Sequence, residues 1–178
     1  FPTRRSSDLS ASHIEEAVGI AKSTGSYGPV TEQPLYNMLD RDQVEGEVED
    51  TCARHGIGLV VWSPLAQGVL TGKYNNGIPD ASRAKSVDQN WFARQLESGR
   101  IDRVRRLTEL AAEMATSTSA LALAWALKNK VVSSVITGAT KPEQVHENLK
   151  ALEVKITPEI DVRIEEILQN KPVRRKHN

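Results

Sequence analysis

The sequence predicts an α/β fold built around a parallel β-sheet. One observation is the run Leu59–Val61, whose branched apolar residues stand between Gly58 and Pro64. This pattern is typical of a strand that is buried on both faces of a parallel sheet. The second observation is that strand-like and helix-like patterns alternate from residue 29 onward. Such alternation is typical of parallel βα units.

A first helix is predicted to begin at Ser12 and to end at Gly25. Ser12 and Glu15 have the spacing of a capping box, and glycine readily ends a helix. The residues of its expected core face are Ile14, Ala17, Val18 and Ala21.

The segment 29–36 is predicted to be a short strand that ends near Gln33, because Pro34 has no backbone N–H for the sheet. Asp40 is predicted to cap a second helix, which ends at Gly56. Its expected core face is Val44, Val48 and Cys52, which repeat every four residues.

Trp62 and Ser63 follow the buried strand directly. Parallel α/β proteins bind ligands at the carboxyl ends of their strands. An indole, a hydroxyl and backbone donors near Gly68 are therefore expected where a cofactor can lie. The alternative is a core strand followed by an ordinary loop.

The second half of the chain begins with a long polar segment, residues 74–99. Loops of this length in compact domains are usually functional or disordered. Apolar spacing then predicts helices over 101–114 and 120–127, the second apolar on nearly every side and therefore buried. A strand is predicted over 131–136.

Two further helices are predicted near the end of the chain. Thr140 and Glu143 fit a capping box at the start of the first. The residues of its expected core face are Val145, Leu149 and Leu152. The last helix is predicted to begin at Thr157 and Pro158 and to end at residues 171–172.

The alternation amounts to three and a half parallel βα units, preceded by a helix with no strand before it. A complete eight-unit barrel needs about 250 residues, so we expect that a region in front of these 178 residues is missing. Residues 1–9 show no periodicity and match one reading frame of a common sequencing adapter. We therefore exclude them from the fold as an expected artefact and expect one partial domain over 10–172 and a basic tail over 173–178.

The composition indicates a globular protein without a nucleic-acid footprint, because 23 basic and 23 acidic residues give a net charge of zero. No apolar run is long enough to insert into a membrane, and no metal ligands are predicted. Cys52 is the single cysteine. It can form no disulfide within the chain, which favours a reducing, cytoplasmic setting.

Five motifs in collinear order point to a known family. They are the segments Glu32–Tyr36, Val61–Gly68, Thr71–Tyr74, Ser82–Ala84 and Gly138–Asn148. Together they resemble the C-terminal half of an aldo-keto reductase, in the branch that contains the potassium-channel beta subunits and their bacterial relatives. The resemblance covers about residues 10–172. It implies a TIM-type (β/α)8 barrel, truncated at the N-terminus, of which this chain holds roughly strands 6–8 and helices 5–8.

The resemblance assigns NADP binding to residues at the predicted strand ends. Gln33 would hold the nicotinamide carboxamide, since an amide side chain offers both a donor and an acceptor. Trp62 would stack on the nicotinamide ring with its flat apolar face. The pyrophosphate would be lined by Ser63, Pro64, Leu65, Ala66 and Gly68, with positive charge from Lys73 and Arg83. The alternative for Arg83 is a mobile surface cation.

On the adenosine side, Gly138 and Thr140 precede a helix N-terminus, whose free N–H groups favour anions. The resemblance puts the 2′-phosphate of NADP there. Gln144, Glu147 and Asn148 share one helix face at i, i+3 and i+4 and would contact the adenosine. The alternative for Glu147 and Asn148 is a solvated helix face.

No catalytic residue can be carried over from the family. Its tetrad is an Asp, a Tyr, a Lys and a His from the first four strands, and the resemblance does not reach those strands. Two functions fit the resemblance. One is the NADP-binding half of an oxidoreductase that reduces small aldehydes or ketones to alcohols, with the fragment itself inactive. The other is a nicotinamide-sensing regulatory subunit that joins a membrane channel, or another oligomer, and has little turnover.

Overall fold

The computed structural model describes residues 5, 6, 8–79, 90, 93–95 and 98–173. The chain forms two compact units. Unit 1 comprises Phe1–Pro64, Trp125–Gly138 and Asn170–Asn178, and unit 2 comprises Leu65–Ala124 and Ala139–Gln169. The predicted cofactor residue Arg83 lies outside the described residues, as do Trp91 and the basic residues 174–176.

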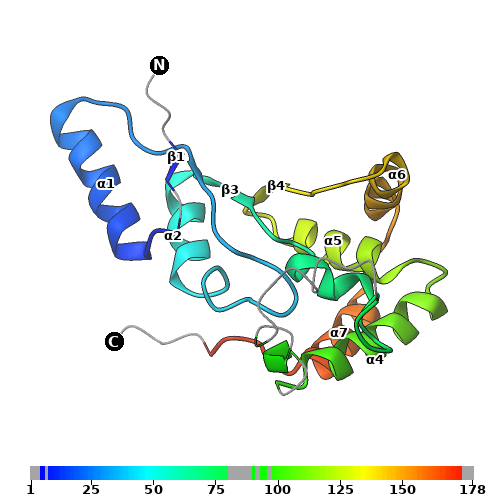
Figure 1. Ribbon diagram of the computed structural model, residues 1–178. Helices are drawn as coiled ribbons and strands as arrows, with labels where there is room; N and C mark the ends of the chain where they lie inside the picture. The colour runs from blue at the N-terminus through cyan, green and yellow to red at the C-terminus, as the bar shows by residue number, and fades with distance from the viewer. Residues whose placement is uncertain (1–4, 7, 80–89, 91–92, 96–97, 174–178) are drawn as a thin grey trace. The chain divides into compact units, whose positions relative to one another are not determined.

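Unit 1 is built on a four-stranded parallel sheet in the order β1-β2-β3-β4 (Figure 1). The strands are β1 Arg5–Ser6, β2 Thr31–Glu32, β3 Gly58–Val61 and β4 Val132–Val135. The prediction of a parallel α/β sheet is therefore confirmed, with β2, β3 and β4 at the expected places. The prediction that no strand precedes the first helix is wrong, because residues 5 and 6 pair with Thr31 and Glu32.

The central strand β3 is buried on one face only. Leu59 and Val61 are buried, whereas Gly58 and Val60 are partly exposed. Successive side chains of a strand point to opposite faces, so the prediction of burial on both faces is wrong for the face of Val60. Gly58 has its own packing role, because a Cβ there would lie 2.3 Å from the hydroxyl of Ser133 on β4.

Helix α1, Ala11–Thr24, lies beside α2, Glu47–His55 (Figure 1). The expected N-cap Ser12 is wrong: the hydroxyl of Ser10 accepts the N–H of His13, and the helix begins two residues earlier. Glu15 does not complete a capping box. Its carboxylate instead contacts Arg54 and His55 of α2. The predicted end at Gly25 is confirmed, with a left-handed φ of 63°.

Helix α2 begins later than predicted, because Gly46 and not Asp40 precedes its first residue. The N–H groups of Leu39 and Asp40 both donate to Oδ1 of Asn37 at 2.9 Å. This side-chain turn competes with helix formation at this point in the chain. The predicted end at Gly56 and the buried positions of Val48 and Cys52 are confirmed.

A cluster of buried and partly buried polar and aromatic side chains lies in unit 1, and we name it the Arg41 cluster. It consists of Tyr36, Arg41, Glu45, Trp125 and Asn170. The guanidinium of Arg41 donates to both carboxylate oxygens of Glu45, at 2.9 and 2.6 Å, and lies 5.0 Å from the centroid of the Trp125 ring. Asn170 donates to the carbonyl of Met38 at 2.9 Å. The cluster thereby joins distant segments of the chain.

Unit 2 is mainly helical. Its elements are η1 Ala66–Thr71, α4 Arg100–Glu113, most of α5 Thr118–Lys128, α6 Pro142–Leu149, η3 Lys150–Leu152 and α7 Pro158–Leu168. The predictions for α4 and α5 are confirmed: α4 has a buried stripe from Ile101 to Ala111, and α5 is buried along 118–126. The predicted cap Thr157 accepts the N–H of Ile160, although α7 ends at Leu168, before the expected stop at 171–172.

Helix α6 differs most from its prediction, because no residue of it is buried. Its expected core residues Val145 and Leu149 are 49% and 55% exposed, and Leu152 on η3 is 72% exposed. The sequence correctly gives an amphipathic helix, but its apolar stripe faces solvent.

No single helix within the described ranges is long and apolar enough to cross a bilayer, and only α4 and α5 taken together, as a bent pair, meet that test of length and composition.

Candidate functional site

In unit 1, the carboxyl ends of three parallel strands bring predicted site residues to one edge of the sheet. Gln33 directly follows β2, Trp62 directly follows β3, and Gly138 comes three residues after β4. Because the strands run in the same direction and are hydrogen-bonded neighbours, their carboxyl ends share one edge. This is the edge at which parallel α/β proteins bind ligands.

Trp62 is held at this edge by its backbone. Its N–H donates to the carbonyl of Pro34 at 3.1 Å, and its carbonyl accepts the N–H of Tyr36 at 3.4 Å. The prediction that Pro34 ends the strand is confirmed for β2. Pairing nevertheless resumes at Leu35, because proline lacks a donor but keeps its acceptor. Trp62 is partly exposed.

Asn37 is a residue of this edge that the sequence reading missed. It is fully buried, and its Nδ2 donates to the carbonyl of Ser63 at 3.0 Å. Ser63 has a positive φ of 52°, which is uncommon for a residue other than glycine. Asn37 therefore fixes the strained backbone that follows Trp62 and Ser63. The signal was an asparagine after a strand, which is a frequent turn residue.

Tyr36 is not available as a solvent-exposed general acid. Its hydroxyl donates to Glu45 at 2.7 Å in the Arg41 cluster. Burial and the neighbouring carboxylate of Glu45 raise the pKa of Tyr36 well above its usual range. Tyr36 is thus a structural hydrogen-bond donor.

In unit 2, the predicted pyrophosphate loop has an unusual backbone. Ala66, Gln67 and Gly68 have φ angles of 47°, 56° and 94° in succession. The turn is closed by the N–H of Gly68, which donates to the carbonyl of Leu65 at 2.8 Å. The hydroxyl of Thr71 donates to the carbonyl of Gly68 at 2.8 Å. Tight turns with positive φ present backbone groups to small anions.

Lys73 lies across this turn. A Cβ at Gly68 would be 2.7 Å from Nζ of Lys73, so the glycine leaves the space that the ammonium occupies. The same Nζ lies 4.9 Å from the centroid of the buried Tyr74 ring. Lys73 is itself exposed. A solvent-exposed cation therefore lies over a glycine turn. A cation and such a turn together suit the binding of a phosphate.

The start of α6 is held together by Thr140 and Gln144. The N–H and the hydroxyl of Thr140 both donate to Oε1 of Gln144, at 2.7 and 3.2 Å. The predicted capping box of Thr140 with Glu143 is therefore wrong, because Gln144 and not Glu143 contacts Thr140. Lys141 is the N-cap and makes no side-chain capping bond.

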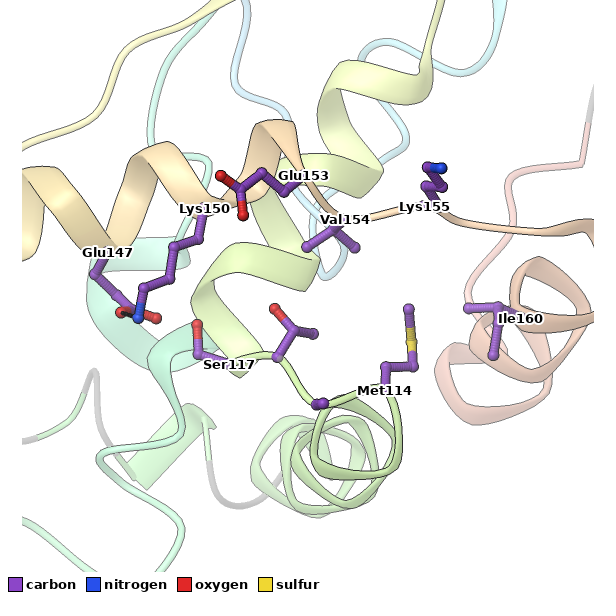
Figure 2. A pocket seen from close by; sticks show the side chains of 10 residues that line it. Met114, Ser117, Glu147, Lys150, Glu153, Val154, Lys155 and Ile160 are labelled. Atoms are coloured by element: carbon purple, nitrogen blue, oxygen red, sulfur yellow. Dashed lines mark ion pairs between the residues drawn. The ribbon is translucent and has the colours of Figure 1, made fainter.

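Glu147 borders a pocket of about 720 Å³ in unit 2. Its carboxylate lies 2.6 Å from the ammonium of Lys150. Figure 2 shows these two groups pointing toward one another, with Ser117 on the facing segment. Hydrogen bonds from Lys150 and Ser117 lower the pKa of Glu147. Asn148 is half-buried on the same helix. The pocket lining includes two carboxylates, two ammonium groups and the apolar Met114, Val154 and Ile160.

Within the described ranges, no group of three or more His, Cys, Asp or Glu side chains gathers as a metal site requires. Cys52 is buried, and burial raises the pKa of its thiol to about 11. It therefore packs in the core of unit 1 as a neutral side chain, as predicted.

The parallel sheet of unit 1 places the chain among the α/β proteins, a class whose members bind ligands at the carboxyl ends of their strands. The model of the aldo/keto reductase family matches residues 6–169. The chain belongs to this family, and the predicted resemblance is confirmed. Membership implies the TIM-type barrel fold, with which the parallel sheet of unit 1 agrees.

Three curated relatives are each named as a voltage-gated potassium channel subunit beta. The protein from Schizosaccharomyces pombe is 44% identical over 173 residues, which cover 94% of this chain and 50% of the relative. Those from Arabidopsis thaliana and Oryza sativa subsp. japonica are 46% and 45% identical over 172 residues, covering 94% of this chain and 52% of each relative. The chain therefore spans about half the length of these relatives.

Proposed function

We propose that this chain is the NADP(H)-binding part of an oxidoreductase that reduces small aldehydes or ketones to alcohols. The observation that carries the proposal is the position of Lys73 over the bare Gly68 turn in unit 2. The strand-end residues Gln33 and Trp62 of the parallel sheet in unit 1 support it separately. The bound nicotinamide would supply the hydride, as cofactors supply the chemistry in such enzymes.

The residues present suit this cofactor by their chemistry. Gln33 and Trp62 would hold and stack the nicotinamide, and Lys73 would neutralise a phosphate. Thr140 and the start of α6 would take the 2′-phosphate, with Gln144, Glu147 and Asn148 toward the adenosine. Arg83 would add a second cation. This assignment favours NADPH over NADH, because an extra phosphate gains hydrogen bonds and charge at a helix N-terminus.

The proposal includes a missing N-terminal half, with this chain as roughly strands 6–8 and helices 5–8 of the barrel. The catalytic tetrad would belong to that half, so we expect the chain to bind cofactor without turnover. Residues 1–9 stay assigned to an adapter-derived segment, and 10–172 to the partial barrel. A reducing, cytoplasmic setting is inferred from the unpaired Cys52.

The test is a fluorescence titration of the chain with NADPH and with NADH. We expect NADPH to quench tryptophan emission at lower concentration than NADH does. Trp62→Ala should lose most of the quenching and weaken binding, while the double variant Trp91→Phe/Trp125→Phe serves as the control that keeps Trp62 and its signal. Normal NADPH binding by Trp62→Ala would show that the nicotinamide has been placed wrongly. Aldehyde-dependent NADPH oxidation above background would contradict the assignment of catalysis to the other half.

A second candidate function is a nicotinamide-sensing subunit of a membrane channel with little turnover, which is favoured by the names of the three relatives. Measuring turnover of a generic aldehyde by a longer protein that contains this chain separates the two. Rapid turnover favours the enzyme, and cofactor binding with almost no turnover favours the channel subunit.

A further inference from the structure

Residues 72–75 of unit 2 form a closed turn that carries Lys73. The N–H of Asn75 donates to the carbonyl of Gly72 at 3.0 Å, so Lys73 and Tyr74 occupy the two central positions of the turn. Tyr74 is buried, whereas Lys73 is exposed. The turn therefore buries one of its central side chains and presents the other to solvent.

Both ends of this turn rest on Thr108 of α4. Nδ2 of Asn75 donates to Oγ1 of Thr108 at 3.0 Å. A Cβ at Gly72, whose φ is 78°, would lie 3.1 Å from the same Oγ1. The Thr108 hydroxyl in turn donates to the carbonyl of Val104 at 2.8 Å, which fixes its direction. One hydroxyl group thus anchors the turn to α4.

The hydrogen bonds of Thr108 and Asn75 are of unequal completeness. The buried Thr118 of α5 also donates to Oγ1 of Thr108, at 3.0 Å. Thr108 therefore makes all three hydrogen bonds of which a hydroxyl is capable. Oδ1 of Asn75, in contrast, is buried and has no hydrogen-bond partner within the described residues. The Nδ2 group is therefore the part of the amide that holds the turn.

The turn is linked to the place where the Lys73 ammonium lies. The N–H of Lys73 donates to Oγ1 of Thr71 at 3.4 Å, and that hydroxyl donates to the carbonyl of Gly68 at 2.8 Å. The ammonium itself fills the space beside Gly68 and lies 4.9 Å from the centroid of the Tyr74 ring. A shift of the turn on α4 therefore moves the ammonium relative to Gly68.

We propose that Asn75 and Thr108 are positioning residues, which hold Lys73 over the Gly68 turn and thereby raise the affinity of the chain for the phosphate of its cofactor. The inference rests on the proposed NADP binding and adds two residues to which no cofactor contact is assigned. Asn75 acts through the backbone of the turn, and Thr108 acts through Asn75. A cation that is already in place binds an anion more tightly, because less conformational entropy is lost on binding.

NADPH titrations of the full chain, followed by tryptophan fluorescence, test the proposal as a double-mutant cycle. We expect Asn75→Ala to weaken NADPH binding by about threefold to tenfold, and no more than Lys73→Met does. In the Lys73→Met background, Asn75→Ala should change the dissociation constant by less than about twofold, because its effect passes through Lys73. Asn76→Ala is the matched control, since Asn76 is the exposed next residue and should bind NADPH like the wild type.

A pair of substitutions at Thr108 gives a second comparison, which also decides the question if Asn75→Ala does not fold. Thr108→Val removes the hydroxyl and keeps the shape of the side chain, whereas Thr108→Ser keeps the hydroxyl. The valine variant should weaken NADPH binding as Asn75→Ala does, and the serine variant should bind like the wild type. Equal binding by the two, or a full effect of Asn75→Ala in the Lys73→Met background, would overturn the proposal.

An NMR measurement follows the position of Lys73 without any cofactor. Because the Lys73 ammonium lies over the Tyr74 ring, the ring current should shift the neighbouring methylene protons upfield. Asn75→Ala and Thr108→Val should move this shift toward the value of an unfolded chain, and Asn76→Ala should not. An unchanged shift in both variants would overturn the proposal. A wild-type chain that does not bind NADPH counts against the cofactor assignment alone, and the shift then decides whether Asn75 and Thr108 position Lys73.

Discussion

Two ion pairs have the same N–O distance of 2.6 Å: Arg41–Glu45 in the Arg41 cluster of unit 1, and Lys150–Glu147 on η3 and α6 of unit 2. Their surroundings differ. The side chains of Arg41 and Glu45 are 3% and 13% exposed, whereas those of Lys150 and Glu147 are 60% and 33% exposed. A buried charge that loses its partner is left without water, while an exposed one is solvated at once. Equal distances therefore indicate very different contributions to stability.

The largest expected effect is that of Glu45→Ala. The substitution leaves the Arg41 guanidinium buried without its carboxylate and removes the acceptor of the Tyr36 hydroxyl. Breaking a buried pair in this way costs about 3–5 kcal/mol. Equilibrium unfolding in urea, at one fixed protein concentration, measures the loss.

Lys150→Ala is the matched substitution at the exposed pair. It should change the free energy of unfolding by less than about 1 kcal/mol. If the two variants lose similar amounts of stability, burial does not distinguish the contributions of the two ion pairs.

The next, smaller expected effect separates backbone strain from cofactor binding at two glycines of unit 2. Gly68 and Gly77 both have positive φ, 94° and 112°, but a Cβ meets Lys73 only at Gly68 and meets nothing within 4 Å at Gly77. Gly68→Ala and Gly77→Ala should each destabilise by about 1–2 kcal/mol, because both place a side chain in a left-handed conformation.

Only Gly68→Ala should displace the Lys73 ammonium. We therefore expect it alone to weaken NADPH binding, by about tenfold, the size of one charge-assisted hydrogen bond. Titration of both variants with NADPH gives the comparison. Equal binding by the two would mean that the position of Lys73 does not matter for the cofactor.

Elements with a strong local signal were predictable from the sequence. The stripe of α4, the largely apolar α5 and the branched run of β3 each repeat their signal over several residues, and each formed where expected. The candidate strand ends could be placed for the same reason, because a parallel sheet brings carboxyl ends together. The family resemblance rested on these same strand-end residues.

What failed depended on choices between near-equal neighbours or on contacts made elsewhere in the chain. Ser10 and Ser12 are both acceptable caps, and one hydrogen bond decides for Ser10. Asp40 does not cap the helix, because its own backbone N–H donates to the side chain of Asn37, three residues earlier. The stripe of α6 has a correct helical spacing, yet spacing cannot show whether another surface covers it. β1 has only two residues, too few for any periodic pattern.

The smallest expected effect concerns the pH dependence of the exposed pair. Hydrogen bonds from Lys150 and Ser117 lower the pKa of Glu147 in the folded chain. A carboxyl with a lowered folded-state pKa contributes stability above its unfolded value, about 4.3, and the contribution is lost as the pH falls through the folded value. Because Glu147 is one-third exposed, solvent screening limits this contribution to a few tenths of a kcal/mol.

An NMR titration of the Glu147 side-chain carboxyl measures its pKa directly. Lys150→Met should raise the pKa of Glu147 toward its ordinary value and Lys150→Arg should keep it low. Glu113, whose pKa is lowered by Arg163, serves as the internal control that neither variant changes. An unchanged Glu147 pKa in Lys150→Met would assign the shift to Ser117 instead, and the exposed pair would then contribute nothing measurable to the region.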